Sequence, residues 1–385
     1  MRTDIATGGR MTVAVLTPWY PDADHPWDGT FIANQCEALR ASGVRVRVFK
    51  VNRRGPVFTV HEIDPDTRTV VASSSSRFFG SRHFAALLDG GRLWSGSCDA
   101  VLAEGPWMST LLRRVNTPVV VVLHGRQPMT SSGARTDPIR RRIIAASLAR
   151  AAALVAVGAG VREDLPPELR RACTVIPNGV PLDAFPRRAV SASARASAAD
   201  FPRFVSVGNV GANKNQETVL RAFTAVRETW PAASWWVVGD GPERQRLARL
   251  RDQLGHHDRI HFTGRLAPAE VAEILRQSDL FVLPSRVEAF GCVYLEAMAV
   301  GVPTIMPRSA GIAALVDDDR YLHDADDGQE ILAKATAILS SPAQYEQAVA
   351  YGRALADRCT WQAHAEALAD VLRRSVTERA AVLAS

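Results

Sequence analysis

The chain has 385 residues, enough for two or three domains that each have a hydrophobic core. Apolar residues make up 47% and charged residues 22%, a globular balance that excludes collagen-like, low-complexity and disordered classes. The net charge of +6 is uneven, since residues 1–200 hold 26 basic and 17 acidic side chains and the remainder hold 20 and 23. This asymmetry fits a basic half that faces an anionic surface or, equally, a solvated Arg-rich surface. No nucleic-acid-binding signature accompanies the charge, so we expect no nucleic-acid partner.

Apolar runs typical of buried strands alternate with helical segments along the chain, which is the pattern of parallel α/β sheets. A segment rich in Ala, Ser and Arg at residues 186–199 has no apolar period and is expected to link two domains. Before this linker we expect a helix over residues 29–42 and strands at residues 11–18, 44–51, 119–123, 154–157 and 173–176. After it we expect a closing helix over residues 361–383 and strands at residues 204–207, 234–238, 260–262, 280–283 and 304–306.

The cysteines and the apolar stretches bear on location. Five cysteines are scattered without the C-x-x-C spacing of zinc or redox sites, which favours the reducing cytoplasm. The longest apolar stretch, residues 143–161, is mostly Ala and Gly and contains Arg150, so we expect no transmembrane helix. The polar N-terminus precedes only a short apolar run, and we expect no export signal.

Several common catalytic motifs are absent from the sequence, among them the Walker phosphate loop, the G-x-S-x-G elbow and H-E-x-x-H. Arg244 stands where a dinucleotide fingerprint would need a small residue, which argues against a Rossmann dehydrogenase. Asp22 and Asp24 lie in a Pro-flanked loop, where we expect solvated acids. The sequence therefore predicts no metal site and no bound cofactor.

The stretch of residues 284–303 carries the strongest chemical signal. It follows the strand expected at residues 280–283, and Gly291 lets the backbone turn into a helix whose first N–H groups form an anion site. We expect a phosphate group to bind the amides of Phe290, Gly291 and Cys292.

Two glutamates of this stretch, Glu288 and Glu296, are eight residues apart. On one helix that spacing is about 12 Å of rise, too long for the paired carboxylates of a retaining glycosidase at about 5 Å. We expect different roles for them: Glu288 accepts hydrogen bonds from sugar hydroxyls, and Glu296 holds a ribose diol. Without the surrounding motif, two glutamates at this spacing would be interpreted as an acid at a helix N-terminus and an acid on the surface.

These residues together resemble the E-x7-E signature of glycosyltransferase family 4, whose members are retaining enzymes with the GT-B fold. Gly29-Thr30-Phe31 is similar to the family's glycine-bearing loop after the first strand, and residues 175–180 to the end of its first domain. Residues 207–214 resemble its phosphate-binding loop, and residues 238–242 its next strand end. The similarity spans most of the chain and is specific only in combination.

The resemblance implies two doubly wound Rossmann-like α/β domains that face each other across a cleft. The N-terminal, acceptor-binding domain would span residues 1–190 and be joined by the C-terminal helix at about residues 362–385. The C-terminal domain, at residues 200–361, would bind a nucleoside-diphosphate-sugar donor. The implied reaction is sugar transfer with retention to a saccharide, lipid-linked or small-molecule acceptor in glycan or glycoconjugate biosynthesis.

The resemblance also implies roles for single residues. His124 matches the family histidine that contacts the donor sugar, and Lys214 and the helix start near Gly291 would neutralise the departing diphosphate without a metal. The implied catalytic residues are His124, Lys214 and Glu288. The implied donor-binding residues are Gly29, Thr30, Asn209, Lys214, Arg265, Glu288, Ala289, Phe290, Gly291, Cys292 and Glu296.

Two departures from the family pattern keep rival functions open. Asn209 stands where the family usually has Arg, which lowers the expected affinity for the donor unless Arg265 or Arg286 compensates. Ala310 and Ala314 replace a Gly and the Glu of the family's G-G-x-x-E ending. These departures favour a non-catalytic sugar-nucleotide-binding subunit as the alternative. Another GT-B enzyme is a second rival, although an epimerase lacks the E-x7-E pattern and a phosphorylase would need a pyridoxal phosphate lysine that we do not identify.

Aromatic and basic residues of the first half bear on the acceptor. Trp19, Tyr20, Trp27 and Trp107 fall in or near strand-end loops, where they either stack on an acceptor sugar or pack in the core or at its rim. Arg140, Arg141 and Arg142 precede an apolar helix and either rest on anionic lipid headgroups or begin a solvated helix. The lipid alternative places the protein at the inner face of the cell membrane.

Overall fold

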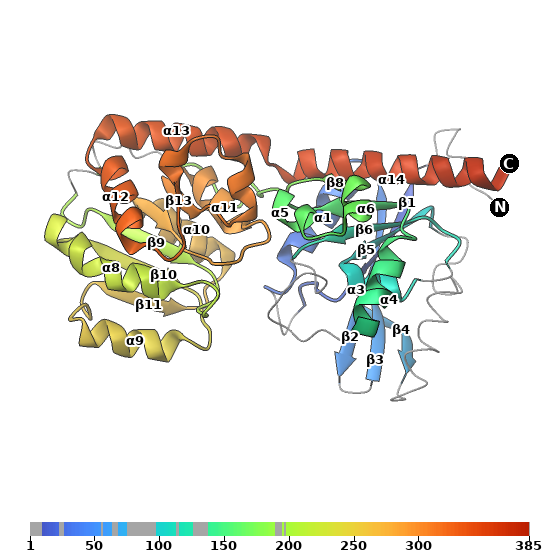
Figure 1. Cartoon of the computed structure of the whole chain (residues 1–385), viewed down its shortest axis with the longest axis horizontal. Helices are drawn as coiled ribbons and strands as arrows, with labels where there is room; N and C mark the ends of the chain where they lie inside the picture. Colours follow the sequence, from blue (N-terminus) through green and yellow to red (C-terminus); the bar gives the residue numbers. More distant parts are fainter. Residues whose placement is uncertain are drawn as a thin grey trace. The chain divides into compact units, whose positions relative to one another are not determined.

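The computed structural model describes residues 10–22, 27–54, 57–63, 68–74, 98–112, 115–125, 138–188, 195 and 198–384 (Figure 1). The chain forms two compact units, one of Met1–Asn178 with Trp361–Ser385 and one of Gly179–Thr360. We call them the N-terminal and C-terminal units.

The N-terminal unit is built on an eight-stranded sheet of order β4-β3-β2-β1-β5-β6-β7-β8. Neighbouring strands from β2 to β8 in this order are parallel, and β3 and β4 extend the sheet as antiparallel strands at one edge. The strands are β1 (Thr12–Thr17), β2 (Arg45–Arg54), β3 (Val57–Ile63), β4 (Arg68–Ser74), β5 (Ala100–Glu104), β6 (Val119–Leu123), β7 (Ala153–Ala156) and β8 (Cys173–Val175). Continuous apolar runs in β1, β5 and β6 fit strands that are covered on both faces.

Six helices are described in this unit: α1 (Thr30–Ala41), α3 (Pro106–Thr110), α4 (Pro138–Leu148), α5 (Ala159–Glu163), α6 (Pro167–Arg171) and α14 (Trp361–Ala384). The last of them, α14, packs against α1 and contacts β5 and β6. Its fully buried residues Ala365, Leu368, Ala369 and Leu372 recur at intervals of three and four, so they form one apolar face. This face returns the C-terminus of the chain to the first unit, as the resemblance implies.

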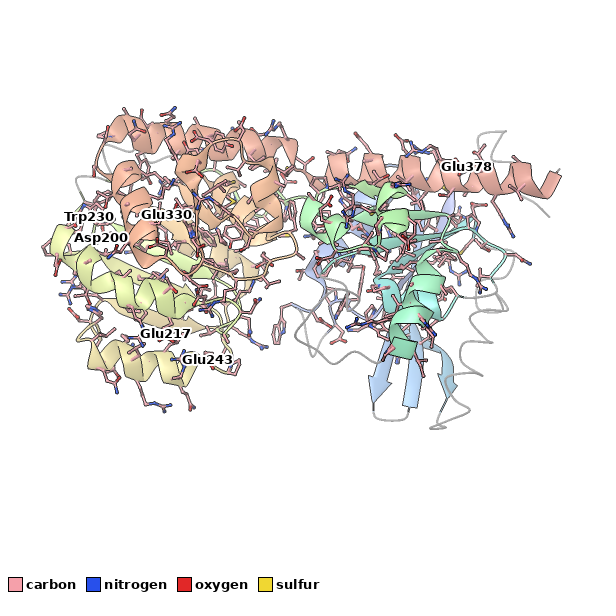
Figure 2. All side chains as sticks on the ribbon, in the orientation of Figure 1. Asp200, Glu217, Trp230, Glu243, Glu330 and Glu378 are labelled. Carbon is pink, nitrogen blue, oxygen red and sulfur yellow. The ribbon has the colours of Figure 1, made fainter. Side chains whose placement is uncertain are left out.

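The C-terminal unit has a six-stranded parallel sheet of order β11-β10-β9-β12-β13-β14. Its strands are β9 (Arg203–Val207), β10 (Ser234–Val238), β11 (Ile260–Gly264), β12 (Leu280–Val282), β13 (Thr304–Pro307) and β14 (Leu322–His323). Its helices are α8 (Gln216–Thr229), α9 (Arg244–Gln253), α10 (Pro268–Arg276), α11 (Cys292–Val300), α12 (Gly328–Leu339) and α13 (Pro342–Arg358), with 3-10 turns at Gly311–Leu315 and Asp319–Tyr321. Figure 2 shows Glu217 on α8 and Glu243 just before α9, and Arg246 donates a 2.6 Å hydrogen bond to each.

The predicted fold class is confirmed, and so are all ten strands expected from apolar runs, within a few residues at their ends. Strands β3, β4, β5 and β14 were not expected. The chain divides at Asn178 and Gly179, before the expected linker at residues 186–199. The segment after Gly179 belongs to the second unit because Val180 donates to the Cys359 carbonyl at 3.0 Å and Arg188 to the Ser278 carbonyl at 2.5 Å.

Each sheet reverses its strand order at one strand, and this reversal places the loops that matter for function. In the N-terminal unit β1 lies between β2 and β5, and in the C-terminal unit β9 lies between β10 and β12. Loops that leave the carboxyl ends at such a reversal diverge to opposite faces and leave a crevice, where α/β proteins bind ligands. The described helices include none that is long and apolar enough to cross a membrane.

Candidate functional site

The C-terminal unit brings Lys214 and Glu288 together at its strand-order reversal. Lys214 lies in the loop after β9, Glu288 lies in the loop after β12, and the Lys214 Nζ forms an ion pair with Glu288 Oε2. The two side chains are 20% and 18% exposed, so solvent and ligands reach both of them. Residues distant in sequence therefore form one charged pair beyond the carboxyl ends of β9 and β12.

Backbone constraints fix the loop that carries Lys214. The Lys214 N–H donates to the Gly211 carbonyl at 2.8 Å, and Asn215 adopts a left-handed conformation with φ of 53° just before α8. Asn tolerates this conformation better than most residues, and its side chain donates to the Ala325 carbonyl at 2.7 Å. At the loop's start, a Cβ on Gly239 would lie 2.0 Å from the Gly208 carbonyl oxygen, so these two strand ends approach as only glycine allows.

The segment that carries Glu288 is tied to the loop after β13. The Glu288 carbonyl accepts from the Gly311 N–H at 3.1 Å, and the Phe290 carbonyl accepts from Ile312 at 2.9 Å. A Cβ on Gly311 would lie 1.9 Å from the Ala289 carbonyl oxygen, so this glycine is required for the close approach. Phe290 is 2% exposed, which leaves its backbone rather than its ring for ligand contact.

The α11 helix begins at Cys292, with Gly291 as its left-handed N-cap at φ of 98°. Tyr294 anchors this end, since its hydroxyl donates to the Leu283 carbonyl at 2.6 Å and its ring packs edge-on against Phe281. The first N–H groups of a helix have no intrahelical acceptor. The structure places Phe290, Gly291 and Cys292 at this helix start, and phosphate binding to their amides stays a prediction.

Glu296 lies one turn further along α11 and is half-buried. Among the residues described, none forms a hydrogen bond or ion pair with its carboxylate, and burial raises its pKa to about 7. A carboxylate without a partner in a helix that is otherwise almost wholly apolar is a free acceptor for ligand hydroxyls.

The remaining donor-site residues of this unit differ in their surroundings. Asn209 is exposed after β9, and Arg265 is exposed directly after β11. Arg286 donates to Asp326 at 2.8 Å and to the Ala212 carbonyl at 3.2 Å, so it braces the Lys214 loop from outside. Of the two arginines proposed to replace the missing Arg at position 209, Arg286 is thus already engaged by protein groups.

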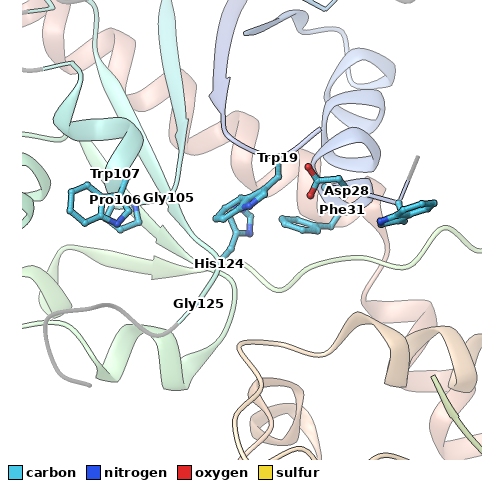
Figure 3. A pocket seen from close by; sticks show the side chains of 10 residues that line it. Trp19, Asp28, Phe31, Gly105, Pro106, Trp107, His124 and Gly125 are labelled. Carbon is cyan, nitrogen blue, oxygen red and sulfur yellow. The ribbon is translucent and has the colours of Figure 1, made fainter. Parts of the chain in front are cut away.

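In the N-terminal unit, a cavity of about 640 Å³ opens at the reversal between β1 and β5 (Figure 3). Its walls combine aromatic rings with the glycine turns of three loops. The lining residues are Trp19, Trp27, Asp28, Gly29, Phe31, Gly105, Pro106, Trp107, His124 and Gly125. Trp19, Trp27 and Trp107 are 40%, 53% and 36% exposed, so these rings do not pack in the core. Stacking on an acceptor sugar and packing at the rim both fit this exposure.

Gly29 is required for the shape of this cavity. It has φ of 69°, and a Cβ there would lie 2.6 Å from the Trp19 backbone carbonyl carbon. Thr30 is exposed at the first position of α1. The structure thus places Gly29 in the cavity wall and Thr30 at its margin, in the unit that does not contain Lys214 and Glu288.

The loop after β1 is held by a buried lysine that the sequence did not reveal. Lys50 donates to the Tyr20 carbonyl at 2.6 Å and to Asp22 at 2.9 Å, and the Asp22 side chain is 13% exposed. The expectation of a solvated acid at Asp22 was therefore wrong, because the lysine on β2 lies beneath this loop. Asp24 lies outside the described residues.

His124 is held by a buried acid that was also missed. Its Nε2 lies 2.5 Å from Glu104 Oε2, and Glu104, the last residue of β5, has no exposed surface. The Phe31 ring lies 4.9 Å from the imidazole, centroid to centroid. The sequence did contain a signal for Glu104, because this residue ends the apolar run of residues 100–103. The run was not recognised as a strand, so the signal was missed.

Two family models match adjoining parts of the chain. "Glycosyltransferase Family 4" matches residues 29–184, and "Glycosyl transferases group 1" matches residues 191–377. Together they span most of the sequence and meet near the boundary between the two units.

Curated relatives and a solved structure agree with these models. A lipopolysaccharide core biosynthesis glycosyltransferase, LpsD of Rhizobium meliloti, is 33% identical over 46% of this chain and 50% of its own length. A GDP-mannose-dependent alpha-(1-6)-phosphatidylinositol monomannoside mannosyltransferase of Mycobacterium tuberculosis is 30% identical over 51% of this chain and 55% of its own length. The chain therefore matches about half the length of these relatives. The fold matches sucrose-phosphate synthase of Thermosynechococcus elongatus with a TM-score of 0.74 at 21% identity, over 95% of this chain and 99% of that one.

Replacing Glu296 by Gln is expected to change how stability depends on pH. Between about pH 4.5 and 7 the folded state holds a proton on Glu296 that the unfolded chain has released, so its contribution to the free energy of unfolding falls as pH rises. Gln does not titrate, so the variant loses this decline, which amounts to about 3 kcal/mol at most. Urea denaturation from pH 5 to pH 8 measures it, with Glu346→Gln on exposed α13 surface as control. Parallel profiles for Glu296→Gln and wild type would contradict the raised pKa of this unpartnered, half-buried carboxyl.

Proposed function

The chain belongs to glycosyltransferase family 4, and we propose that it transfers a sugar from a nucleoside-diphosphate donor to an acceptor with retention at the anomeric carbon. The observation that carries the proposal is the Lys214–Glu288 pair at the strand-order reversal of the C-terminal unit, in the two segments that resemble the family's phosphate and sugar loops. The acceptor class is a saccharide, a lipid-linked sugar or a small molecule. The names of both curated relatives describe glycosyl transfer to glycan or glycolipid acceptors.

Charge explains how this site would act. Release of a nucleoside diphosphate develops negative charge, which the Lys214 ammonium and the N-terminus of α11 would stabilise. When the diphosphate binds Lys214, the ion pair with Glu288 would break, and the Glu288 carboxylate would accept hydrogen bonds from sugar hydroxyls. Same-face attack would follow, with the leaving phosphate helping to deprotonate the acceptor, and His124 would position the sugar.

Truncating the two glutamates should separate their roles. Glu288→Ala should lower kcat by at least about 10²-fold, because it removes a contact that is strongest in the transition state. Glu296→Ala should mainly weaken nucleotide affinity, because a ribose contact is made equally in the ground and transition states. Steady-state kinetics and nucleotide titration measure both, with Glu346→Ala as control. Unaltered turnover in Glu288→Ala, or a Glu296→Ala defect confined to kcat, would refute the assignment.

We also propose that no divalent metal takes part, because Lys214 and a helix N-terminus already supply positive charge where the diphosphate would lie. Sugar transfer should therefore survive EDTA at its full rate. The proposal fails if chelation abolishes transfer and added magnesium or manganese restores it.

The alternative function is a non-catalytic sugar-nucleotide-binding subunit. The observation that favours it is the exposed Asn209 at the end of β9, where the family usually has Arg, together with Ala314 in the 3-10 turn after β13. Slow hydrolysis of the donor separates the two functions, because a competent transferase leaks some sugar to water and a binding module does not.

We further propose that the acceptor side of the protein rests on an anionic membrane surface. On α4, Ile139 and Ile143 are 66% and 42% exposed, and Arg141 and Arg142 are exposed beside them. The side chain of Arg140 lies outside the described residues. Exposed isoleucines between arginines combine apolar insertion with attraction to anionic headgroups.

Association with vesicles that contain anionic lipid should fall steeply as salt is added. Changing Arg140, Arg141 and Arg142 to Ser should weaken it by about 10²-fold, at about 1 kcal/mol for each basic residue. Vesicle flotation measures this, and changing Arg221, Arg249 and Arg276 to Ser in the C-terminal unit is the matched control. No flotation at low salt would leave a small-molecule or free saccharide acceptor as the better account.

A further inference from the structure

A chain of buried polar side chains leads from the C-terminal helix to His124. Its members come from separate elements: His364 from α14, Gln35 from α1 and Glu104 from the end of β5. His364 is 2% exposed, and Gln35 and Glu104 have no exposed surface. Buried polar groups of this kind persist only when their hydrogen bonds are satisfied.

The contacts form one continuous line. The Pro177 carbonyl lies 2.8 Å from His364 Nδ1, and His364 Nε2 lies 3.0 Å from Gln35 Oε1. The side-chain amide group of Gln35 lies 2.6 Å from Glu104 Oε1, and Glu104 Oε2 lies 2.5 Å from His124 Nε2. At the far end, His124 Nδ1 is buried and has no partner among the residues described.

Donors and acceptors must alternate along this line, and that requirement fixes its protons. The Pro177 carbonyl only accepts, so His364 carries a proton on Nδ1. A carboxylate at Glu104 then requires the Gln35 amide to face it and a second proton on His364 Nε2. If His364 is neutral, the Gln35 amide turns over, and Glu104 itself must donate to the Gln35 oxygen. Burial lowers the pKa of His364 to about 4, which favours the second arrangement.

Both arrangements lead to the same state of His124. In each, Glu104 Oε2 has no proton of its own to donate, so His124 must donate from Nε2. In a neutral imidazole that donates from Nε2, Nδ1 carries a lone pair; His124 is one of the residues that line the cavity.

We propose that Glu104 is the positioning residue of the site, and that with Gln35 and His364 it holds His124 in the Nε2–H form with Nδ1 as a hydrogen-bond acceptor. This proposal rests on the proposed function for its catalytic meaning: with its one proton on Nε2 and engaged by Glu104, His124 would position the sugar and would not protonate a leaving group. The state of the imidazole, however, is a property of the protein alone.

Substitution of Glu104 distinguishes this proposal from a merely structural role, because the two lead to different protonation states of His124 in the variants. In Glu104→Gln the whole line stays satisfied, because the new amide oxygen accepts from His124 and its NH2 group donates to a turned Gln35, which donates to neutral His364. The variant should therefore keep the Nε2–H form. Glu104→Leu, of similar size, offers no acceptor, so the two forms of His124 should interconvert and average.

The experiment is ¹⁵N NMR of histidine side chains in the full chain at neutral pH, without substrate, with His124→Asn used to assign its signals among the nine histidines. We expect a protonated Nε2 and an unprotonated Nδ1 in wild type and Glu104→Gln, and averaged shifts in Glu104→Leu. A protonated Nδ1 in wild type, or a reversal in Glu104→Gln, overturns the proposal. If Glu104→Leu does not fold, the wild-type and Gln spectra still decide it. Because no donor is present, this result is independent of whether the chain proves to be a transferase.

Discussion

The reversal of strand order at β9 is the constraint on which the candidate site depends. Because β10 and β12 lie on either side of β9, the loops after β9 and β12 leave the same edge of the sheet and diverge. Lys214 and Glu288 come from these two loops, and glycines at 239 and 311 permit backbone approaches that any side chain would block. The charged pair is thus a consequence of topology, and the start of α11, where we propose that the diphosphate binds, follows the same strand end.

The N-terminal unit also reverses its strand order, and at this reversal aromatic rings and His124 line a cavity. Its reversal at β1 opens an aromatic cavity, and the groups that shape it are held from beneath by buried charge: Lys50 under the loop after β1, and Glu104 behind His124. Buried ionisable groups persist only when paired, so these contacts fix positions rather than add much stability. One unit therefore supplies cationic and anionic contacts, and the other supplies rings and an oriented imidazole.

The sequence predicts the parts of this account that depend on local pattern. Strands such as β6 and β12 are continuous apolar runs, and Glu288, Gly291 and Glu296 fall within one short motif. It does not predict the role of Glu104, because its partners Gln35 and His124 are far away in the chain. The short apolar run of β5 was not recognised as a strand, although Gly105-Pro106 marks its end. The sequence does not predict the ion pair of Asp22 with Lys50 either, because spacing along the chain does not indicate which separate segments come into contact.

The most direct test of the account is release of nucleoside diphosphate from sugar donors by the full chain. The protein would be incubated with UDP-, GDP- and ADP-sugars, with and without saccharide acceptors, and binding of each nucleotide would be followed by thermal shift. The account predicts that at least one donor class both binds and is turned over, and that Lys214→Ala abolishes the turnover. Binding of a nucleotide without release of diphosphate from any of its sugars would contradict a transferase and favour the binding subunit.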